Sequence, residues 1–92
     1  MADYSIEVSA TAERQIKKLS KRDQHRVINV IKQLGVEPRP RGCRKLQAYD
    51  DIYRVRTGVF RILYSVEDDR LLVLILKVGH RKGYTDDYDN PV

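Results

Sequence analysis

Three arginines stand out among the residues of this sequence that could do chemistry. Arg54 and Arg56 alternate with apolar residues in one short segment, and Arg61 lies in the alternating segment that follows. Guanidinium groups bind phosphate oxygens through paired hydrogen bonds and stay charged at physiological pH. Such a group suits the binding of a phosphodiester and of the charge that develops in its transition state. The alternative is that these arginines only keep a sheet soluble and protect its edge.

A second candidate group follows a long apolar segment and contains His80, Arg81, Lys82 and Tyr84. An imidazole can donate or accept a proton near neutral pH, and a guanidinium can stabilise a phosphorane. A tyrosine ring can stack on an unstacked base. The alternative is that His80 is an ordinary surface residue and that Tyr84 covers the core.

The sequence offers no pattern typical of a metal site. Cys43 is the only cysteine, so no intramolecular disulfide can form, and Cys43 has no zinc-ligand spacing with His25 or His80. Asp50 and Asp51 are adjacent and would point to opposite faces of an extended chain. We therefore expect neither a metal nor another cofactor.

Positive charge is concentrated in the middle of the chain. Residues 37–61 contain seven basic and three acidic side chains (+4), whereas residues 1–36 carry +3 and residues 62–92 carry −2, for a net charge of +5. A clustered positive field attracts polyanions, of which nucleic acid is the commonest. A solvated basic face without a ligand is equally compatible with this charge distribution.

The elements that position these residues begin with a strand and two helices. Residues 4–8 alternate as in a half-buried strand, and apolar residues recur at helical spacing from 11 to 19. Ser20 followed by Asp23 is typical of the start of a second helix, whose apolar stripe continues to Leu34. Gly35 is predicted to end this helix as a left-handed cap, before two prolines that prevent its continuation.

The second half of the sequence predicts strands. Residues 52–56 and 59–66 alternate on either side of a Thr57-Gly58 turn, and residues 71–78 are apolar on both faces, as in an interior strand. The order βααβββ indicates an α+β fold, with a small antiparallel-type sheet and an N-terminal helical hairpin packed on one face. The three arginines are then expected on the face that the helices do not cover.

Length and hydropathy limit the organisation of the chain. Ninety-two residues suit one domain, 1–92. The opening residues lack the features of a secretory signal, and the longest apolar run, residues 71–76, is far shorter than the ~20 residues that span a bilayer. We therefore expect a cytoplasmic protein without a membrane partner.

Taken together, four segments resemble the RelE/ParE toxin superfamily. They are Lys45-Leu46, Tyr53-Arg54-Val55-Arg56, Phe60-Arg61-Ile62-Leu63-Tyr64 and Val78-Gly79-His80-Arg81-Lys82, with a tyrosine after the last. The resemblance covers nearly the whole chain and depends on the joint order and spacing of the segments. It implies a RelE-like sheet flanked by a helical hairpin, and an antitoxin encoded alongside, in a complex expected to be oligomeric.

The RelE branch of this superfamily implies a definite activity. The resemblance implies a metal-independent mRNA endoribonuclease that acts in the ribosomal A site, contacts ribosomal RNA and inhibits translation. A ribose 2′-hydroxyl attacks the adjacent phosphate, leaving a 2′,3′-cyclic phosphate and a 5′-hydroxyl. A ParE-like protein shares the fold but poisons DNA gyrase by binding, and a degenerate relative would only bind its antitoxin or regulate its operon. The arginines with His80 and Tyr84 favour the RelE branch.

The resemblance also implies roles for individual residues. Arg54 and Arg56 fall at two basic strand positions of the family, Arg61 at its transition-state arginine and Arg81 at a residue for the leaving group. Some members have lysines in place of Arg54 and Arg56, and arginine, with a pKa above ~12, is a poor general base. Proton transfer must then fall to another residue, for which His80 is the natural candidate, and the sequence leaves the identity of the general base open.

The remaining expected contacts are with RNA. A loop rich in proline and glycine is expected to attract the ribosomal RNA backbone without fixed geometry, and the spacing leaves open whether Tyr84 or Tyr88 is the base-stacking tyrosine. The residues expected to bind RNA are Arg39, Arg41, Arg44, Lys45, Lys82 and Tyr88.

Overall fold

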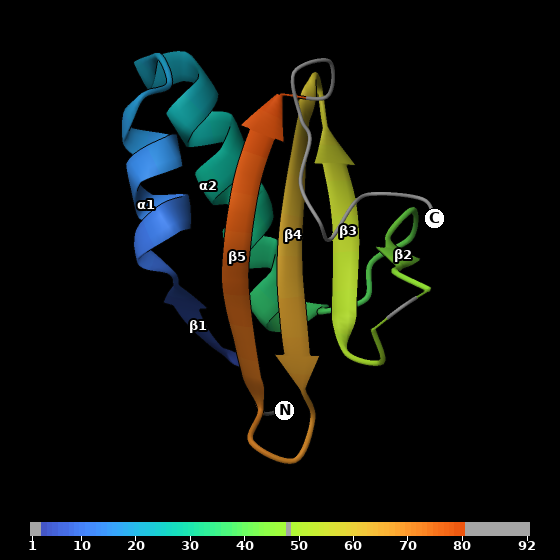
Figure 1. Cartoon of the computed structure of the whole chain (residues 1–92). Coiled ribbons are helices and arrows are strands. Elements are labelled where there is room, and N and C mark those ends of the chain that lie inside the picture. Colours follow the sequence, from blue (N-terminus) through green and yellow to red (C-terminus); the bar gives the residue numbers. More distant parts are fainter. Residues whose placement is uncertain (1–2, 48, 81–92) are drawn as a thin grey trace.

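Two helices cover one face of a five-stranded sheet in the computed structural model, which describes residues 3–47 and 49–80 (Figure 1). The elements are β1 (Ser5–Val8), α1 (Ala10–Lys17), α2 (Lys21–Val36), β2 (Arg44–Lys45), β3 (Ile52–Thr57), β4 (Phe60–Glu67) and β5 (Leu72–His80). The predicted α+β fold is confirmed, and the order βααβββ is modified only by the two-residue strand β2. Neither helix of the described part is long and apolar enough to cross a membrane.

Serine side chains begin both helices. The hydroxyl of Ser9 accepts a hydrogen bond from the backbone N–H of Ala12 at 3.1 Å, and that of Ser20 accepts one from Asp23 at 3.2 Å. Such caps satisfy backbone donors that the first turn of a helix leaves without a partner. The start predicted at Ser20 is thus confirmed, and α1 begins one residue before the predicted Thr11.

The predicted cap at Gly35 is wrong, because α2 continues through Gly35 to Val36. β1 approaches the helix closely here, and the backbone N–H of Tyr4 donates to the Gly35 carbonyl at 2.8 Å. A Cβ on Gly35 would lie 3.1 Å from the carbonyl oxygen of Tyr4. Glycine therefore serves close packing at this position, and the helix ends just before Pro38, whose missing N–H stops it.

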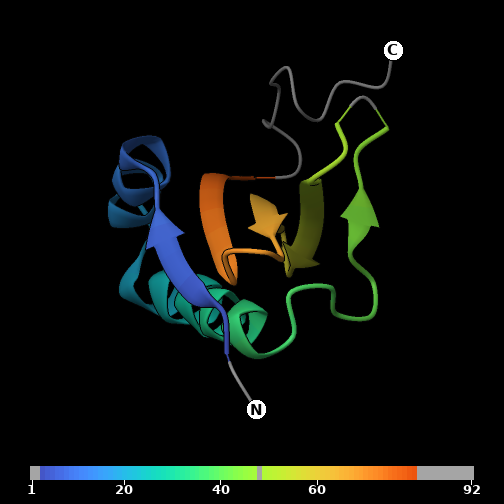
Figure 2. The ribbon, with the colours of Figure 1, turned by 90° about the horizontal axis from the view of Figure 1, so that it is seen from below.

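The strands have the order β1-β5-β4-β3-β2, so β5 is interior, as its apolar sequence predicts. β1 runs parallel to β5, and the other neighbours are antiparallel. Viewed from below, α2 runs across one face of the sheet, and β2 forms the edge of the sheet opposite β1 (Figure 2). The β3–β4 turn and the end of β5 lie at one end of the sheet, opposite the β4–β5 turn (Figure 1).

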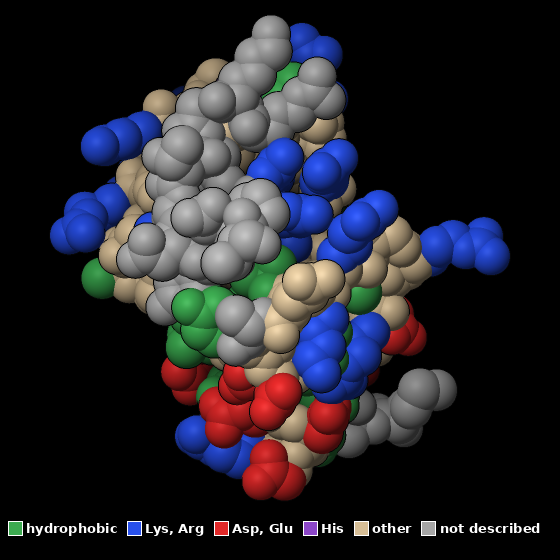
Figure 3. Space-filling view, turned by 45° about the vertical axis from the view of Figure 1, so that its right-hand side comes forward, with side chains coloured by type: hydrophobic (Ala, Val, Ile, Leu, Met, Phe, Trp, Pro, Cys, Tyr) green, Lys and Arg blue, Asp and Glu red, His purple; other side chains and the backbone are tan. Residues whose placement is uncertain are grey.

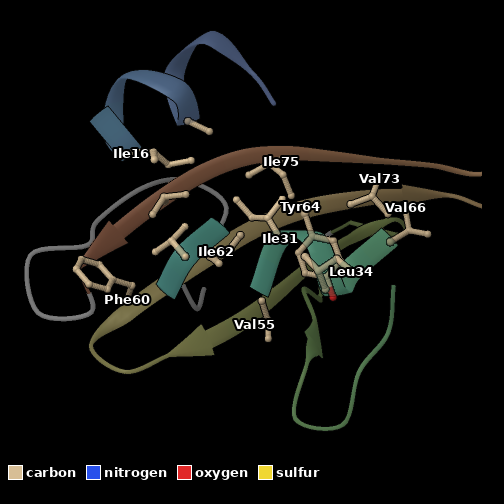
Figure 4. Packing of buried hydrophobic residues seen from close by; sticks show 13 residues of the cluster. Ile16, Ile31, Leu34, Val55, Phe60, Ile62, Tyr64, Val66, Val73 and Ile75 are labelled. Carbon is tan, nitrogen blue, oxygen red and sulfur yellow. The ribbon is translucent and has the colours of Figure 1, made fainter. Parts of the chain in front are cut away.

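The main core lies between the helices and the sheet. Ile31 and Leu34 of α2 pack there beside the fully buried Tyr64 of β4 (Figure 4). The predicted inward face of β4 is confirmed, and consists of Phe60, Ile62, Tyr64 and Val66. A separate, smaller cluster contains Leu46, Ile52 and Leu63, with the half-buried Tyr49 and Leu76 packed against it. Since Leu63 alternates with Ile62 and Tyr64, this second cluster lies on the face away from the helices.

β5 contains an irregularity that changes which side chains share a face. Tyr64 of β4 pairs with Ile75, but the preceding Leu63 pairs with Lys77, so Leu76 is an extra residue. Such a bulge shifts the alternation of side chains by one position. Val78 consequently joins the main core, and Lys77, opposite Leu63, lies on the other face.

Candidate functional site

The register brings together the three arginines predicted to form a site. Arg56 of β3 lies directly opposite Arg61 of β4, and Arg54 lies directly opposite Leu63. Opposed residues have Cβ atoms about 4.5–5.5 Å apart and share a face of the sheet. Leu63 belongs to the cluster away from the helices, so the predicted placement of the arginines is confirmed. We call this surface the arginine face and define it by Arg44, Arg54, Arg56, Arg61 and Lys77.

Arg44 and Lys77 extend the arginine face on both sides of the β3–β4 hairpin. Arg44, predicted to lie on a loop, is in β2 and directly opposite Arg54. Lys77 is opposite Leu63 on β5. Lys77 was missed by sequence reasoning, because strict alternation from the buried Val73 and Ile75 would place it in the main core. The only available signal was a lysine within an otherwise apolar strand.

The cations of this face differ in burial. Arg54, Arg61 and Lys77 are half-buried, whereas Arg44 and Arg56 are exposed. The Nε atom of Arg61 is itself buried, and Arg61 stands on β4, which has strands on both sides. Like charges directly opposite one another destabilise a sheet. An anion bound between Arg56 and Arg61 would reduce this repulsion and could accept hydrogen bonds from both guanidinium groups.

His80 is the last residue of β5 and lies beside a core residue of β4 rather than on the arginine face. It pairs with Phe60, and the two rings have centroids 5.9 Å apart at an interplanar angle of 78°. Phe60 belongs to the main core on the helix side. His80 therefore leaves β5 on the opposite face from the three arginines, since the bulge at Leu76 inverts the alternation between that residue and the end of β5. Its role in proton transfer stays a prediction.

Arg39 is held by specific contacts, whereas the sequence predicted that the arginines of its loop have no fixed geometry. Its guanidinium donates two hydrogen bonds to Asp68, at 3.0 and 2.8 Å, and a third from Nε to the hydroxyl of Tyr53 at 2.9 Å. The guanidinium carbon also lies 5.1 Å from the centre of the Tyr53 ring. The Tyr4 hydroxyl donates to Asp68 at 2.6 Å. The idea that Arg39 lacks fixed geometry is wrong, and this ion pair ties its loop to the β4–β5 turn.

The electrostatics of this ion pair follow from its contacts. Hydrogen bonds from Arg39 and Tyr4 lower the pKa of Asp68 from 3.8 to about 2, and the bond to Asp68 raises the pKa of Tyr4. Hydrogen bonds to Asp68 and Tyr53 raise the pKa of Arg39. Arg39 thus stays charged, but its charge is directed to a carboxylate. Both Arg39 and Arg41 are exposed, but the ion pair with Asp68 makes Arg39 the weaker candidate for contacting RNA.

Tyr64 anchors the beginning of the same loop. Its hydroxyl donates to the carbonyl of Pro38 at 2.8 Å, and its ring stacks on Tyr53 with centroids 5.8 Å apart. Burial raises the pKa of Tyr64, with a further contribution from Cys43, so the phenol stays protonated. The loop that leads to Arg44 is therefore attached to β4 by a buried hydrogen bond and to the β4–β5 turn by an ion pair.

Charge is separated over the surface seen in Figure 3. Lys and Arg side chains gather over its upper and middle parts, and Asp and Glu gather at its lower end. The lower end corresponds to the β4–β5 turn, which contains Glu67, Asp68 and Asp69. Lys45 pairs with Tyr53 and so leaves β2 on the other face from Arg44. Arg56 and Arg61 lie next to the β3–β4 turn, at the opposite end of the sheet from these acidic residues.

Some predicted residues fall outside this description. Arg81, Lys82, Tyr84 and Tyr88 lie outside the described residues. Within residues 3–47 and 49–80, no three His, Cys, Asp or Glu side chains gather as a group that could hold a metal ion. The guanidinium groups of the arginine face can bind phosphate and stabilise negative charge.

Comparisons with known proteins agree on one family. Residues 6–83 match the family described as "ParE toxin of type II toxin-antitoxin system, parDE". The chain is 29% identical over 91 residues to RelE1 of Methanocaldococcus jannaschii, covering 96% of this chain and 98% of that protein. It is 30% identical over 79 residues to toxin RelG of Mycobacterium tuberculosis, covering 85% and 91%.

A solved structure is similar to this fold throughout. The crystal structure of the toxin–antitoxin complex RelBE2 from Mycobacterium tuberculosis contains a chain that is 31% identical, with a TM-score of 0.76. The match covers 86% of this chain and 99% of that chain.

Proposed function

Because the chain belongs to the RelE/ParE superfamily of type II toxin–antitoxin toxins, we propose that it is a metal-independent endoribonuclease that cleaves mRNA in the ribosomal A site. The named relatives RelE1 and RelG support the RelE branch. The observation that carries the proposal is the opposed pair Arg56 and Arg61 on the arginine face. This pair provides neighbouring guanidinium groups for one phosphodiester.

The proposed reaction is the attack of a ribose 2′-hydroxyl on the adjacent phosphorus. The new bond forms between the 2′-oxygen and phosphorus while the bond to the 5′-oxygen breaks, so the products are a 2′,3′-cyclic phosphate and a 5′-hydroxyl. Negative charge increases on the phosphoryl oxygens in the transition state. Arg61, with its buried Nε, is the donor whose position the sheet fixes best, and donors fixed in advance stabilise such charge most effectively.

The other arginines are proposed to position the substrate. Arg54 and Arg44 form a second opposed pair beside Arg56, so the cations follow the sheet from β4 to its β2 edge. A row of this kind can bind successive phosphates of a single strand. Arginines hold charge but transfer protons poorly. Proton transfer by His80, leaving-group work by Arg81 and base stacking by Tyr84 or Tyr88 are proposed from the family resemblance.

An antitoxin is the proposed protein partner. The similar solved chain belongs to a toxin–antitoxin complex. Because the arginine face is basic, an antitoxin with an acidic segment could cover it and block access to RNA. We expect the toxin to co-purify with a small partner of this kind when both are expressed from the native operon. Recovery of a harmless protein without a partner from that operon would count against a toxin.

Gyrase poisoning is the second candidate function, because the matching family carries the ParE description. One experiment separates the two functions. The purified protein is added to ribosomes translating a reporter mRNA, the new 5′ ends are mapped, and a parallel reaction contains gyrase and plasmid DNA. Cuts within A-site codons that disappear in the double variant Arg56→Ala/Arg61→Ala support the nuclease. Intact mRNA together with trapped gyrase–DNA complexes would overturn the proposal in favour of gyrase.

A further inference from the structure

The bulge in β5 places Lys77 and Gly79 on the arginine face, and neither residue has a part in the function described so far. Leu76 is the extra residue between the pairs Tyr64–Ile75 and Leu63–Lys77. Beyond it, Lys77 lies opposite Leu63 and Gly79 lies opposite Arg61. Bulges often occur beside active sites, where they redirect a side chain. Without the bulge, Lys77 would face the main core. With it, Lys77 lies on the same face as Arg61, the catalytic arginine of the proposed function.

Gly79 leaves an open position in a row of long cationic side chains. The row across three strands consists of Arg56, Arg61 and Gly79. Any side chain at Gly79 would begin about 4.5–5.5 Å from the Cβ of Arg61 and project over the same face. Glycine within a strand often marks a place where a ligand approaches the backbone closely. Position 79 thus adds no side chain of its own beside Arg61.

Lys77 borders this open position from the same strand. Its Cα is two residues from that of Gly79, a separation of about 7 Å along a strand. It is also the diagonal neighbour of Arg61, at about 7–8 Å. A lysine ammonium is a compact charge with three donors on a flexible stem, so it can reach an anion placed between these residues. Arg61 and Lys77 therefore flank the same gap from adjacent strands.

Lys77 lies beyond the part of β5 that pairs with β1. β1 pairs with β5 from Leu72 to Ile75, so at Lys77 the paired neighbour of β5 is β4. The position of the half-buried Lys77 opposite Leu63 brings a positive charge onto the face that holds Arg61.

We propose that Gly79 and Lys77 complete a phosphate-binding site with Arg61, in which the RNA phosphodiester approaches the backbone at Gly79 and Lys77 contacts its oxygens. This site rests on the proposed function and adds to it a phosphate contact from β5 and a steric requirement for glycine. Lys77 acts as a cation that binds phosphate, and the bulge at Leu76 is the device that places it there.

Five substitutions test the site. Lys77→Gln removes the charge, Lys77→Arg keeps it, and Gly79→Ala and Gly79→Val fill the gap in two steps. Lys32→Gln is the matched control, because Lys32 is an exposed lysine of α2 in the other layer. Each variant is measured by single-turnover cleavage on saturating ribosomes, with thermal unfolding followed in parallel. Binding to a 2′-O-methyl RNA oligonucleotide, which cannot be cleaved, is measured over a range of salt concentrations.

We expect Lys77→Gln to slow cleavage about 10- to 100-fold, the usual effect of losing a hydrogen bond to a charged group. Lys77→Arg and Lys32→Gln should stay within a few-fold of the parental rate. Gly79→Ala should slow cleavage less than Gly79→Val. The log–log salt slope of oligonucleotide binding should fall by about one unit in Lys77→Gln and stay unchanged in Lys32→Gln.

The two proposals fail in different ways. Parental cleavage with unchanged rates and salt slope in Lys77→Gln and folded Gly79→Ala would overturn the phosphate site alone. Absence of parental cleavage would overturn the nuclease, and the oligonucleotide salt slope would then decide the site: a loss of slope in Lys77→Gln supports it, and no loss overturns it.

Discussion

Replacing Arg61 with alanine tests whether the arginine face carries chemistry or only affinity. Arg61 is half-buried on a strand with neighbours on both sides, and its Nε is buried. A donor positioned in this way is the kind whose removal from a transition state slows a reaction about 10²–10³-fold, or about 2.7–4 kcal/mol. We expect a loss of this size in Arg61→Ala.

The stability of the same variant should change much less than its activity. Arg56 is directly opposite, and like charges in this position destabilise a sheet by about 0.2–1 kcal/mol. Removal of Arg61 relieves that repulsion but also removes the packing of its alkyl chain. These effects have opposite signs, so the melting temperature should stay within about 5 °C of the parental value.

The assay compares Arg61→Ala with Arg41→Ala. Arg41 is exposed on the loop before β2, where a cation can attract RNA without contacting the reacting phosphate. Its loss should weaken ribosome binding at raised salt, reduce the log–log salt slope by about one unit, and leave the single-turnover rate at saturation unchanged. Growth arrest should be abolished by Arg61→Ala. A folded Arg61→Ala that cleaves within a few-fold of the parental rate on saturating ribosomes would refute a catalytic role for this face.

Three further predictions concern pH, the buried tyrosine and metal. Because Arg39 and Tyr4 lower the pKa of Asp68 from 3.8 to about 2, its stabilising contribution is complete above pH 3.8 and is lost as the pH falls through about 2. Urea denaturation should therefore show a weaker acid destabilisation in Asp68→Asn than in the parental protein, and equal slopes would contradict the ion pair. Tyr64→Phe should lower the free energy of unfolding by about 1–3 kcal/mol, because it leaves the buried carbonyl that now accepts from Tyr64 without this donor, and an unchanged denaturation midpoint would show that the hydroxyl is dispensable. Cleavage should survive treatment of the toxin with EDTA followed by removal of the chelator, because guanidinium groups supply the positive charge; loss of activity with rescue by added metal would disprove this.

The faces of the β3–β4 hairpin could be predicted from sequence because their alternation is uninterrupted. Val55 and Phe60 reach the main core, and Arg56 and Arg61 the opposite face, as a period of two requires. The start of α2 was also predictable, since the Ser20 cap is a local interaction. These features depend only on residues close together in the chain.

The rest of the site depends on contacts that local patterns do not contain. The bulge at Leu76 reverses the alternation within β5, so Lys77 was missed, and the face from which His80 leaves the strand could not be derived from the sequence. Arg39 pairs with Asp68, 29 residues away, and nothing near either residue in the sequence indicates the other. Gly35 could not be recognised as a packing glycine without knowing that β1 crosses α2 there.

The interior position of β5 has a consequence for biosynthesis. β1 is the first strand of the described residues, yet its partner β5 is the last of them, and the hydrogen bond from Ser9 to Leu76 joins residues 67 apart. A nascent chain can form the helical hairpin and the β3–β4 hairpin from local contacts, but its sheet stays incomplete until β5 has left the ribosome. For a protein proposed to attack ribosomes, this order of assembly delays the complete active surface until β5 is available to pair.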